Sequence, residues 1–185
     1  MATDNGIEIM NGSPLLGKKV VYFLQPTTDP VGHSAILPAL QTGGSISIGG
    51  DSIDEQTKFG RVVLPSTNED SIDLETAVVW GDRSIDVLKN AKHEGNQVKV
   101  WRVVIDKKFS WKDGDQQLFP AMFGYGVVDS LDIDDGDDLV KASYTLNIVG
   151  MLRDGSFAVS DDQLNALTQL YDFEQPGEKS GNFGY

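Results

Sequence analysis

The residues best suited to chemistry are the aspartates that crowd the segment 129–138. Six of these ten residues are aspartate and none is basic. Carboxylate oxygens bind Ca²⁺, and an EF-hand loop requires a glycine at its sixth position and a glutamate at its twelfth. When Asp132 opens the loop, Gly136 falls fifth and Ser143 twelfth. The segment fails this template, so we interpret residues 134–138 as an acidic hairpin turn, with an adventitious Ca²⁺ site as the alternative.

Other residue types that carry catalysis are scarce. The sequence has no cysteine, which excludes disulfides, thiolate metal sites and a cysteine nucleophile. His33 lies in a proline- and glycine-rich stretch, and His93 falls in the last turn of a predicted helix, where a cation suits the helix dipole. No nucleophile elbow, zinc-protease motif or phosphate-binding glycine loop occurs. We therefore expect no enzyme, no metal site and no cofactor.

Length and charge narrow the class of protein further. The chain has 185 residues, the size of one domain, and 39% hydrophobic residues, enough for a core. Its formal charge of −13 repels nucleic acid backbones, although such a surface could form a wall along which DNA slides. No apolar run is long enough to span a membrane, and residues 1–11 lack the pattern of a signal peptide. We expect a soluble protein made in the cytoplasm.

The segment 72–80 shows the clearest strand alternation. Ile72, Leu74 and Thr76 point to one face, while Asp73 and Glu75 point to the other. This pattern predicts a half-buried strand with an acidic outer face. Similar patterns predict five further strands, and a long polar loop at 50–71 connects the strand 45–49 with the strand 72–80. The five strands are 17–25, 45–49, 98–106, 121–133 and 139–149.

Two segments show helical spacing. In the first, Asp82 or Ser84 can cap a short helix that Gly95 ends, with Ile85, Leu88 and Ala91 on one side. In the second, the pair Ser160 and Gln163 forms a capping box before Leu164, Leu167 and Leu170. The strands follow one another without alternating helices. The fold class is therefore mainly β, an antiparallel sandwich or barrel-like domain with one flanking α-helix.

The order of several segments resembles the major tail tube proteins of long-tailed, siphovirus-type phages that infect Gram-positive bacteria. The second helix has no counterpart in that pattern. The segments that carry the resemblance are GKKVVYFLQP at 17–26, DEQTKFGR at 54–61, TAVVWGDRSIDVLKNAKHEG followed at once by KVWRVVID, GYGVVDSLDIDDGDDLVKASYTLNIVG at 124–150, and YDFEQPGEKSG at 171–181.

The resemblance implies a structural subunit of a phage tail tube. It implies one domain over 1–185, with an inter-ring loop at about 50–71 and a C-terminal arm at about 171–185. Such subunits form stacked hexameric rings whose strands join an inner β-barrel, through which DNA passes without specific binding. The implied partners are further copies of the chain, a tape measure protein, and tail terminator and distal tail proteins, with no membrane. The implied location is the virion tail, after assembly in the host cytoplasm.

Within that assembly, acidic residues gain a role as lumen lining that repels DNA phosphates. The candidates are Asp73 and Glu75 first, then Asp129 and Asp132; the alternative for each is a solvated acid on an outer face. The candidates for contacts between rings are Asp54, Glu55, Lys58 and Arg61.

Two other functions are open from the sequence. One is the inner tube of a phage-tail-like bacteriocin or of a secretion machine, which would share the fold. The other is a carbohydrate-binding β-sandwich that uses tryptophan as a sugar platform. Trp80 and Trp101 lie in strand patterns and are expected in the core, so only Trp111 is a candidate for such a platform.

Overall fold

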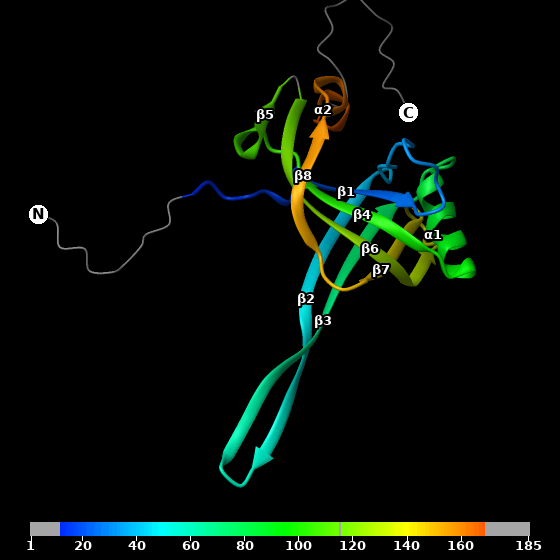
Figure 1. The fold of residues 1–185 in the computed structure, drawn as a ribbon. Coiled ribbons are helices and arrows are strands. Elements are labelled where there is room, and N and C mark those ends of the chain that lie inside the picture. The colour runs from blue at the N-terminus through cyan, green and yellow to red at the C-terminus, as the bar shows by residue number, and fades with distance from the viewer. Residues whose placement is uncertain (1–11, 115, 169–185) are drawn as a thin grey trace, which may run out of the picture.

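The protein is built on one antiparallel sheet of eight strands (Figure 1), seen in a computed structural model that describes residues 12–114 and 116–168. The strand order is β1-β4-β6-β7-β3-β2, with β5 and β8 paired to the remaining parts of β6. The predicted β-rich, antiparallel class is confirmed. The strands are β1 Val20–Pro26, β2 Gln41–Thr57, β3 Gly60–Ala77, β4 Gln97–Val104, β5 Trp111–Asp113, β6 Gln116–Asp134, β7 Lys141–Ile148 and β8 Arg153–Val159.

Both predicted helices form, and their ends follow the caps read from the sequence. In α1 (Arg83–Glu94), the Asp82 carboxylate accepts a hydrogen bond from the Ser84 amide, and Gly95 ends the helix with φ +72°. In α2 (Asp161–Thr168), Ser160 and Gln163 exchange the two hydrogen bonds of a capping box. Two short 3₁₀ turns, η1 Gly17–Lys19 and η2 Lys107–Phe109, precede β1 and β5.

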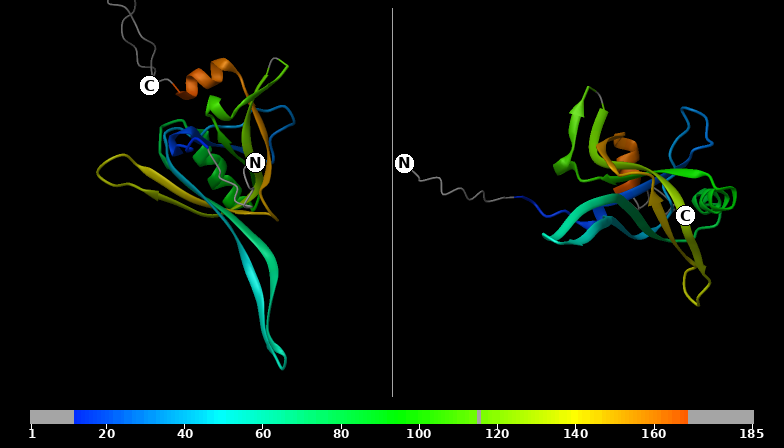
Figure 2. Two further views of the ribbon diagram at one scale, coloured as in Figure 1. Left: turned by 90° about the vertical axis from the view of Figure 1, so that its left-hand side faces the viewer. Right: turned by 60° about the horizontal axis from the view of Figure 1, so that its bottom comes forward.

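The sheet carries a hydrophobic core on each face, because successive side chains of a strand point to opposite faces and both faces include apolar residues. In β4, Val98 and Val100 belong to the core beneath α1, whereas Val103 belongs to a second core. That second core includes Phe119 of β6 and Leu164 of α2. Figures 1 and 2 show α1 and α2 in separate places against the sheet. A strand such as β4 therefore buries apolar residues on both of its faces within one subunit.

The segment 50–71, predicted as a loop, is the outer part of a long β-hairpin, so that prediction is wrong. Strands β2 and β3 pair from Gln41–Thr76 out to Thr57–Gly60, and the outer part projects well beyond the rest of the molecule (Figure 1). Its residues are exposed on both faces, from 47 to 69 without interruption. Because neither face is buried, its sequence lacks the apolar–polar alternation that predicts a strand.

Three smaller predictions are corrected or lie outside the described residues. The segment between the predicted strands 98–106 and 121–133 contains a further short strand, because Trp111–Asp113 pairs with the start of β6. Trp80 is 102% exposed in the loop before α1, so its expected place in the core is wrong. Trp101 does pack against the second core. The C-terminal arm at 171–185 falls outside the described residues.

Candidate assembly and lumen surfaces

Three of the four predicted lumen acids lie on one polar face formed by β2, β3, β7 and β6. The pairing aligns Glu75 with Ser143 and Ser143 with Asp132, across three neighbouring strands. The next row aligns Asp73 with Thr145. Side chains directly opposite one another in a sheet share a face. We call this surface the polar face; it also includes the exposed Val127, and its remaining polar members are Ser45, Ser47, Ser71, Ser130, Asp134, Lys141 and Asn147.

Hydroxyl groups hold the two central acids in place on the polar face. The Thr145 hydroxyl donates to Asp73 Oδ1 at 2.6 Å, and the Thr42 hydroxyl donates to Glu75 Oε1 at 2.8 Å. Lys141 Nζ lies 3.4 Å from the same Glu75 oxygen. The Thr42 hydrogen bond and then the Lys141 charge hold the pKa of Glu75 below its usual value. Glu75 therefore stays ionised at neutral pH, and both carboxylates are held in place on the polar face.

Asp129 does not join the other three acids. It lies at a β-bulge of β6, between Val128, which pairs with Leu146, and Ser130, which pairs with Thr145. Its carbonyl accepts a 2.6 Å hydrogen bond from Lys92 Nζ of α1. A bulge inserts a residue that has no partner across the strand pair, so the sequence alternation could not assign its face.

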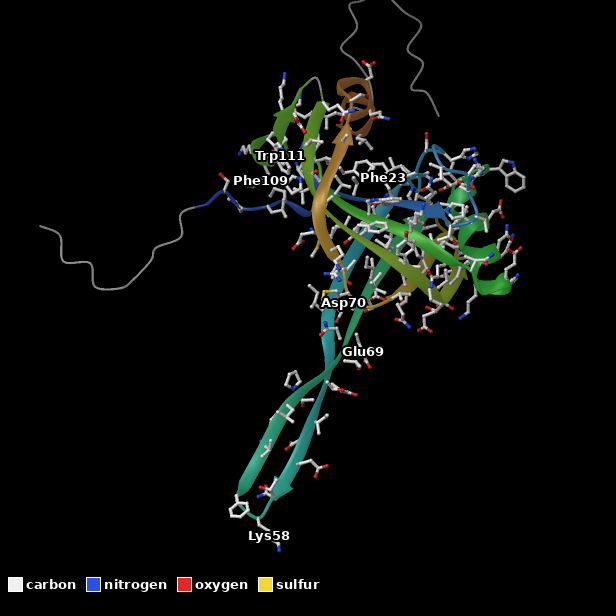
Figure 3. All side chains as sticks on the ribbon, viewed as in Figure 1. Phe23, Lys58, Glu69, Asp70, Phe109 and Trp111 are labelled. Atoms are coloured by element: carbon white, nitrogen blue, oxygen red, sulfur yellow. The ribbon has the colours of Figure 1, made fainter. Side chains whose placement is uncertain are left out.

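The four predicted ring-contact residues all lie in the projecting part of the hairpin. Arg61 donates two hydrogen bonds to the Asp54 carboxylate across the two strands. This contact lowers the pKa of Asp54 and raises that of Arg61. Glu55 pairs with Val62 on the opposite face, and Lys58 lies in the turn at the tip, where Figure 3 labels it. The Asp54–Arg61 ion pair therefore lies on one face of the hairpin, and Glu55 and Val62 lie on the other.

That other face carries a stripe of aliphatic side chains that sequence reasoning missed. Ile53 pairs with Leu64, and Val62 lies two residues further along β3 on the same face. All three are about half exposed, and Phe59 at the tip is 100% exposed. Exposed apolar surface of this extent on a projection is typical of a binding surface. The run of apolar residues Val62, Val63 and Leu64 was visible in the sequence, but without alternation it did not indicate a strand with an aliphatic face.

The alternative sites receive no support from the described residues. No group of three or more acidic or histidine residues there could hold a metal ion, the acidic turn included. Trp101 packs against Phe123 and Phe157, and no ring contact in this part of the chain joins two of the three tryptophans. Among the helices described, none is long and apolar enough to cross a membrane.

Comparison with known families decides the identity. The family described as "Phage tail tube protein" matches residues 14–154, more than half of the chain. This chain belongs to the phage tail tube protein family. It is 31% identical, over 174 residues, to the tail tube protein gp17.1* of Bacillus phage SPP1. The alignment covers 93% of this chain and 64% of that relative, so the chain spans a little under two thirds of the relative's length.

Solved structures agree with the fold of this tail tube protein. The SPP1 tail tube structure, determined by solid-state NMR and cryo-EM, matches with a TM-score of 0.68 and 28% identity over 91% of this chain and 95% of that one. A gene transfer agent tail, computed with C6 symmetry, matches with a TM-score of 0.55 and 16% identity over 75% and 96% of the two chains. The tube of an extracellular contractile injection system matches with a TM-score of 0.52 and 15% identity over 79% and 93%. The last two show a shared fold.

The predicted resemblance to tail tube proteins of phages that infect Gram-positive bacteria is therefore confirmed.

Proposed function

We propose that the tail tube subunit forms hexameric rings that stack around a lumen, with the polar face turned toward that lumen. The observation that carries this proposal is the composition of the polar face across four neighbouring strands. It consists mainly of serine, threonine, asparagine and acidic residues, whereas the opposite face of the same strands is buried. The six-fold symmetry of a tail with the same fold supports the ring size.

The acids of this face act by repulsion. Asp73, Glu75 and Asp132 project from neighbouring strands, and a ring repeats each of them in every subunit. A wall of one charge sign, with few lysines or arginines, repels phosphates and keeps DNA from adhering while it moves. Short hydroxyl side chains between the acids leave no bulky obstacle. DNA then passes without specific binding, and the subunit itself has no catalytic role.

The projecting hairpin serves contacts between rings, as proposed for Asp54, Glu55, Lys58 and Arg61. The support is that this part of the chain buries nothing within its own subunit while exposing aliphatic side chains. The C-terminal arm would add to these contacts. The remaining proposed partners are a tape measure protein inside the tube and terminator and distal tail proteins at its ends, with assembly in the host cytoplasm.

Thiol labelling tests which face lines the lumen, because the chain has no cysteine of its own. Ser143→Cys places a thiol in the middle of the polar face, and Asn90→Cys places one on exposed α1 as the matched control. In assembled tubes, a small maleimide should label both thiols. A maleimide attached to a globular protein should label only the α1 thiol. Equal labelling of both by the large reagent contradicts the lumen assignment.

Charge reversal tests the repulsion. Asp73→Lys with Glu75→Lys changes the polar face, and Asp86→Lys with Glu94→Lys makes the same change in charge on α1. Both variants should form tubes of normal length under the electron microscope. Phage carrying the first variant should deliver DNA poorly, and phage carrying the second should deliver it normally. Normal infectivity of the first variant contradicts the proposed role of these acids.

A tube in a tail-like injection particle is the second candidate, favoured by the fold shared with a contractile injection system. The two functions differ in whether a DNA-filled head is attached. Nucleic acid in purified particles that contain this protein supports the phage tail, and particles free of nucleic acid support the injection particle.

A further inference from the structure

An apolar hollow lies on the side of the molecule away from the hairpin. Its volume is about 390 Å³, and its walls come from β1, β8, α2 and the loop that follows β1. Phe23 and Phe157 form one wall as stacked rings, with centroids 4.9 Å apart. Leu37 and Leu167 form the others, and both reach the surface at least in part. The described chain leaves this hollow open to a side chain from outside.

The hairpin tip presents an aromatic side chain with no place in its own subunit. Phe59 is 100% exposed in the two-residue turn between Thr57 and Gly60. The turn is well built: the Thr57 hydroxyl donates to the Gly60 carbonyl at 2.8 Å and accepts from the Phe59 amide at 3.2 Å. A phenylalanine held outward at the end of a projection is costly in water unless another surface buries it.

The two features lie at opposite ends of the molecule. Figure 1 and the left view of Figure 2 both place the hairpin tip at one end and α2 at the other. In Figure 3, Lys58 marks the tip and Phe23 lies on the α2 side. A contact between two different surfaces of identical chains is heterologous and can repeat without closing, which is how a filament grows. A knob at one end and a hollow at the other supply such a contact.

Charge also matches at the two ends. Lys58, next to Phe59, forms no ion pair with any residue in the described part of the chain. At the hollow, Gln163 of α2 forms part of the lining, and its neighbour Asp162 is exposed. Lys58 beside the tip and Asp162 on α2 carry opposite charges, which would attract one another and orient the approach.

We propose that Phe59 of one subunit inserts into the hollow between Phe23, Leu37, Phe157 and Leu167 of a subunit in the adjacent ring. This inference rests on the proposed stacking of rings and names the surface that receives the hairpin. Insertion removes the aromatic ring of Phe59 from water and fills the hollow in the same step. The aliphatic stripe of Ile53, Val62 and Leu64 then lies along the outside of the receiving subunit.

Disulfide formation tests this contact directly. Lys58→Cys, which keeps the Phe59 ring at the tip, is combined with Leu37→Cys, and tubes are assembled under reducing conditions and then oxidised. Because a disulfide requires Cα atoms within about 7 Å, only seated tips can react. The expected result is a ladder of linked subunits on a non-reducing gel. The matched control combines Lys58→Cys with Val31→Cys, an exposed position in the same loop as Leu37, and should give no ladder.

The possible results separate this inference from the proposed function. Wild-type chain that forms no rings or tubes overturns both. Tubes whose Lys58→Cys, Leu37→Cys pair gives no ladder overturn the insertion and leave the tube intact. A ladder that appears only after the chain is truncated at Thr168 overturns the insertion as well, because the chain's own residues 169–185 would then occupy the hollow.

A second measurement does not depend on cysteine geometry. Phe59→Ala should raise the protein concentration needed for tube growth by about ten-fold, the change expected for losing about 1.4 kcal/mol per contact. Val31→Ala, at an equally exposed apolar residue outside the hollow, should leave that concentration unchanged. An unchanged growth concentration for Phe59→Ala overturns the proposal.

Discussion

The two halves of the β2–β3 hairpin use the same two strands in opposite ways. In the half within the sheet, β3 pairs with β7 and buries Ile72 and Leu74 beneath α1. In the projecting half, β3 pairs with β2 alone, and Leu64 stays 52% exposed. One half is stable because the subunit buries it. In the other half the apolar side chains are exposed, and only a neighbouring subunit can bury them, so the stability of this half depends on assembly.

The boundary between the halves is sharp. Asp70 is 4% exposed and accepts a 2.8 Å hydrogen bond from the Leu152 amide, whereas the adjacent Glu69 is exposed (Figure 3). Two residues further out, Gly50 marks a shift in the register of β2 against β3, and its φ of +150° is a conformation that favours glycine. The residues of β3 that stabilise the subunit therefore differ from the residues available for assembly. Substitutions in β3 can then change one property without changing the other.

The largest difference should appear between two leucines of β3. Leu74→Ala should lower the free energy of unfolding by about 3 kcal/mol, because it opens a cavity in the core beneath α1. Leu64→Ala should change it by less than about 0.5 kcal/mol, since its side chain is exposed. Denaturant unfolding of the unassembled subunit measures both. Equal losses would mean that the projecting half is buried within the monomer.

The next difference should appear at the boundary. Asp70→Ala should cost about 2 kcal/mol, because it leaves the Leu152 amide without its acceptor inside the fold. Glu69→Ala serves as the control and should leave the unfolding midpoint unchanged, since that side chain is exposed. The same denaturant titration checks the pair. A loss at Glu69 as large as at Asp70 would place the boundary further out along the hairpin.

A smaller loss of stability should follow from substitution of Gly50, where the register of β2 against β3 shifts. Gly50→Ala adds a Cβ that would collide with the Thr67 carbonyl, at a strained φ, and should cost about 1–2 kcal/mol. The loss should stay within the projecting half, as faster amide hydrogen exchange at 52–64. Gly49→Ala is the matched control, because its Cβ would meet only an ordinary contact with the Glu69 carbonyl. Unchanged hydrogen exchange in Gly50→Ala would contradict the close approach of Gly50 to the Thr67 carbonyl.

The smallest effects should come from acid titration of one carboxylate in each half. Glu75 and Asp54 both have lowered pKa values in the folded chain, from ordinary values of 4.5 and 3.8. Their contacts therefore stabilise the fold fully above those ordinary values, and that contribution disappears as the pH falls through the lower folded values. Solvent screening keeps the change in stability small.

NMR titration of the side-chain carboxyl carbons measures both groups. Thr42→Val should raise the pKa of Glu75 and leave that of Asp54 unchanged, because only Glu75 accepts from Thr42. A Glu75 pKa at or above 4.5 in the unaltered chain would show that the Thr42 and Lys141 contacts are absent in solution.

The sequence predicted the buried half of this hairpin and missed the other half for one physical reason. Burial of one face imposes alternation, which is visible in Ile72, Leu74 and Thr76 with Asp73 and Glu75 between them. The same reason explains why strands β6 and β7 were found, whereas the helix caps were found from side chains that accept hydrogen bonds from backbone amides. Where both faces are exposed, no alternation is imposed, so 50–71 looked like a loop. Trp80 misled for the opposite reason, since its alternation continues past the end of β3 into an exposed loop.

The sequence predicted part of the candidate site, namely the face on which Asp73 and Glu75 lie, but not which strands are neighbours. The register that brings Asp132 beside Ser143 and Glu75 depends on pairing between distant strands, which no local pattern reports. Face alternation still placed Asp73 and Glu75 correctly on an outer face. It could not place Asp129, because the bulge breaks the period of two at that residue.

Cryo-EM of tubes assembled from the purified chain tests the central claim most directly. We predict six-fold rings in which Asp73, Glu75 and Asp132 line the lumen and α1 lies on the outside. A chain that stays monomeric at high concentration, or tubes in which α1 faces the lumen and the polar face lies outside, would contradict the account.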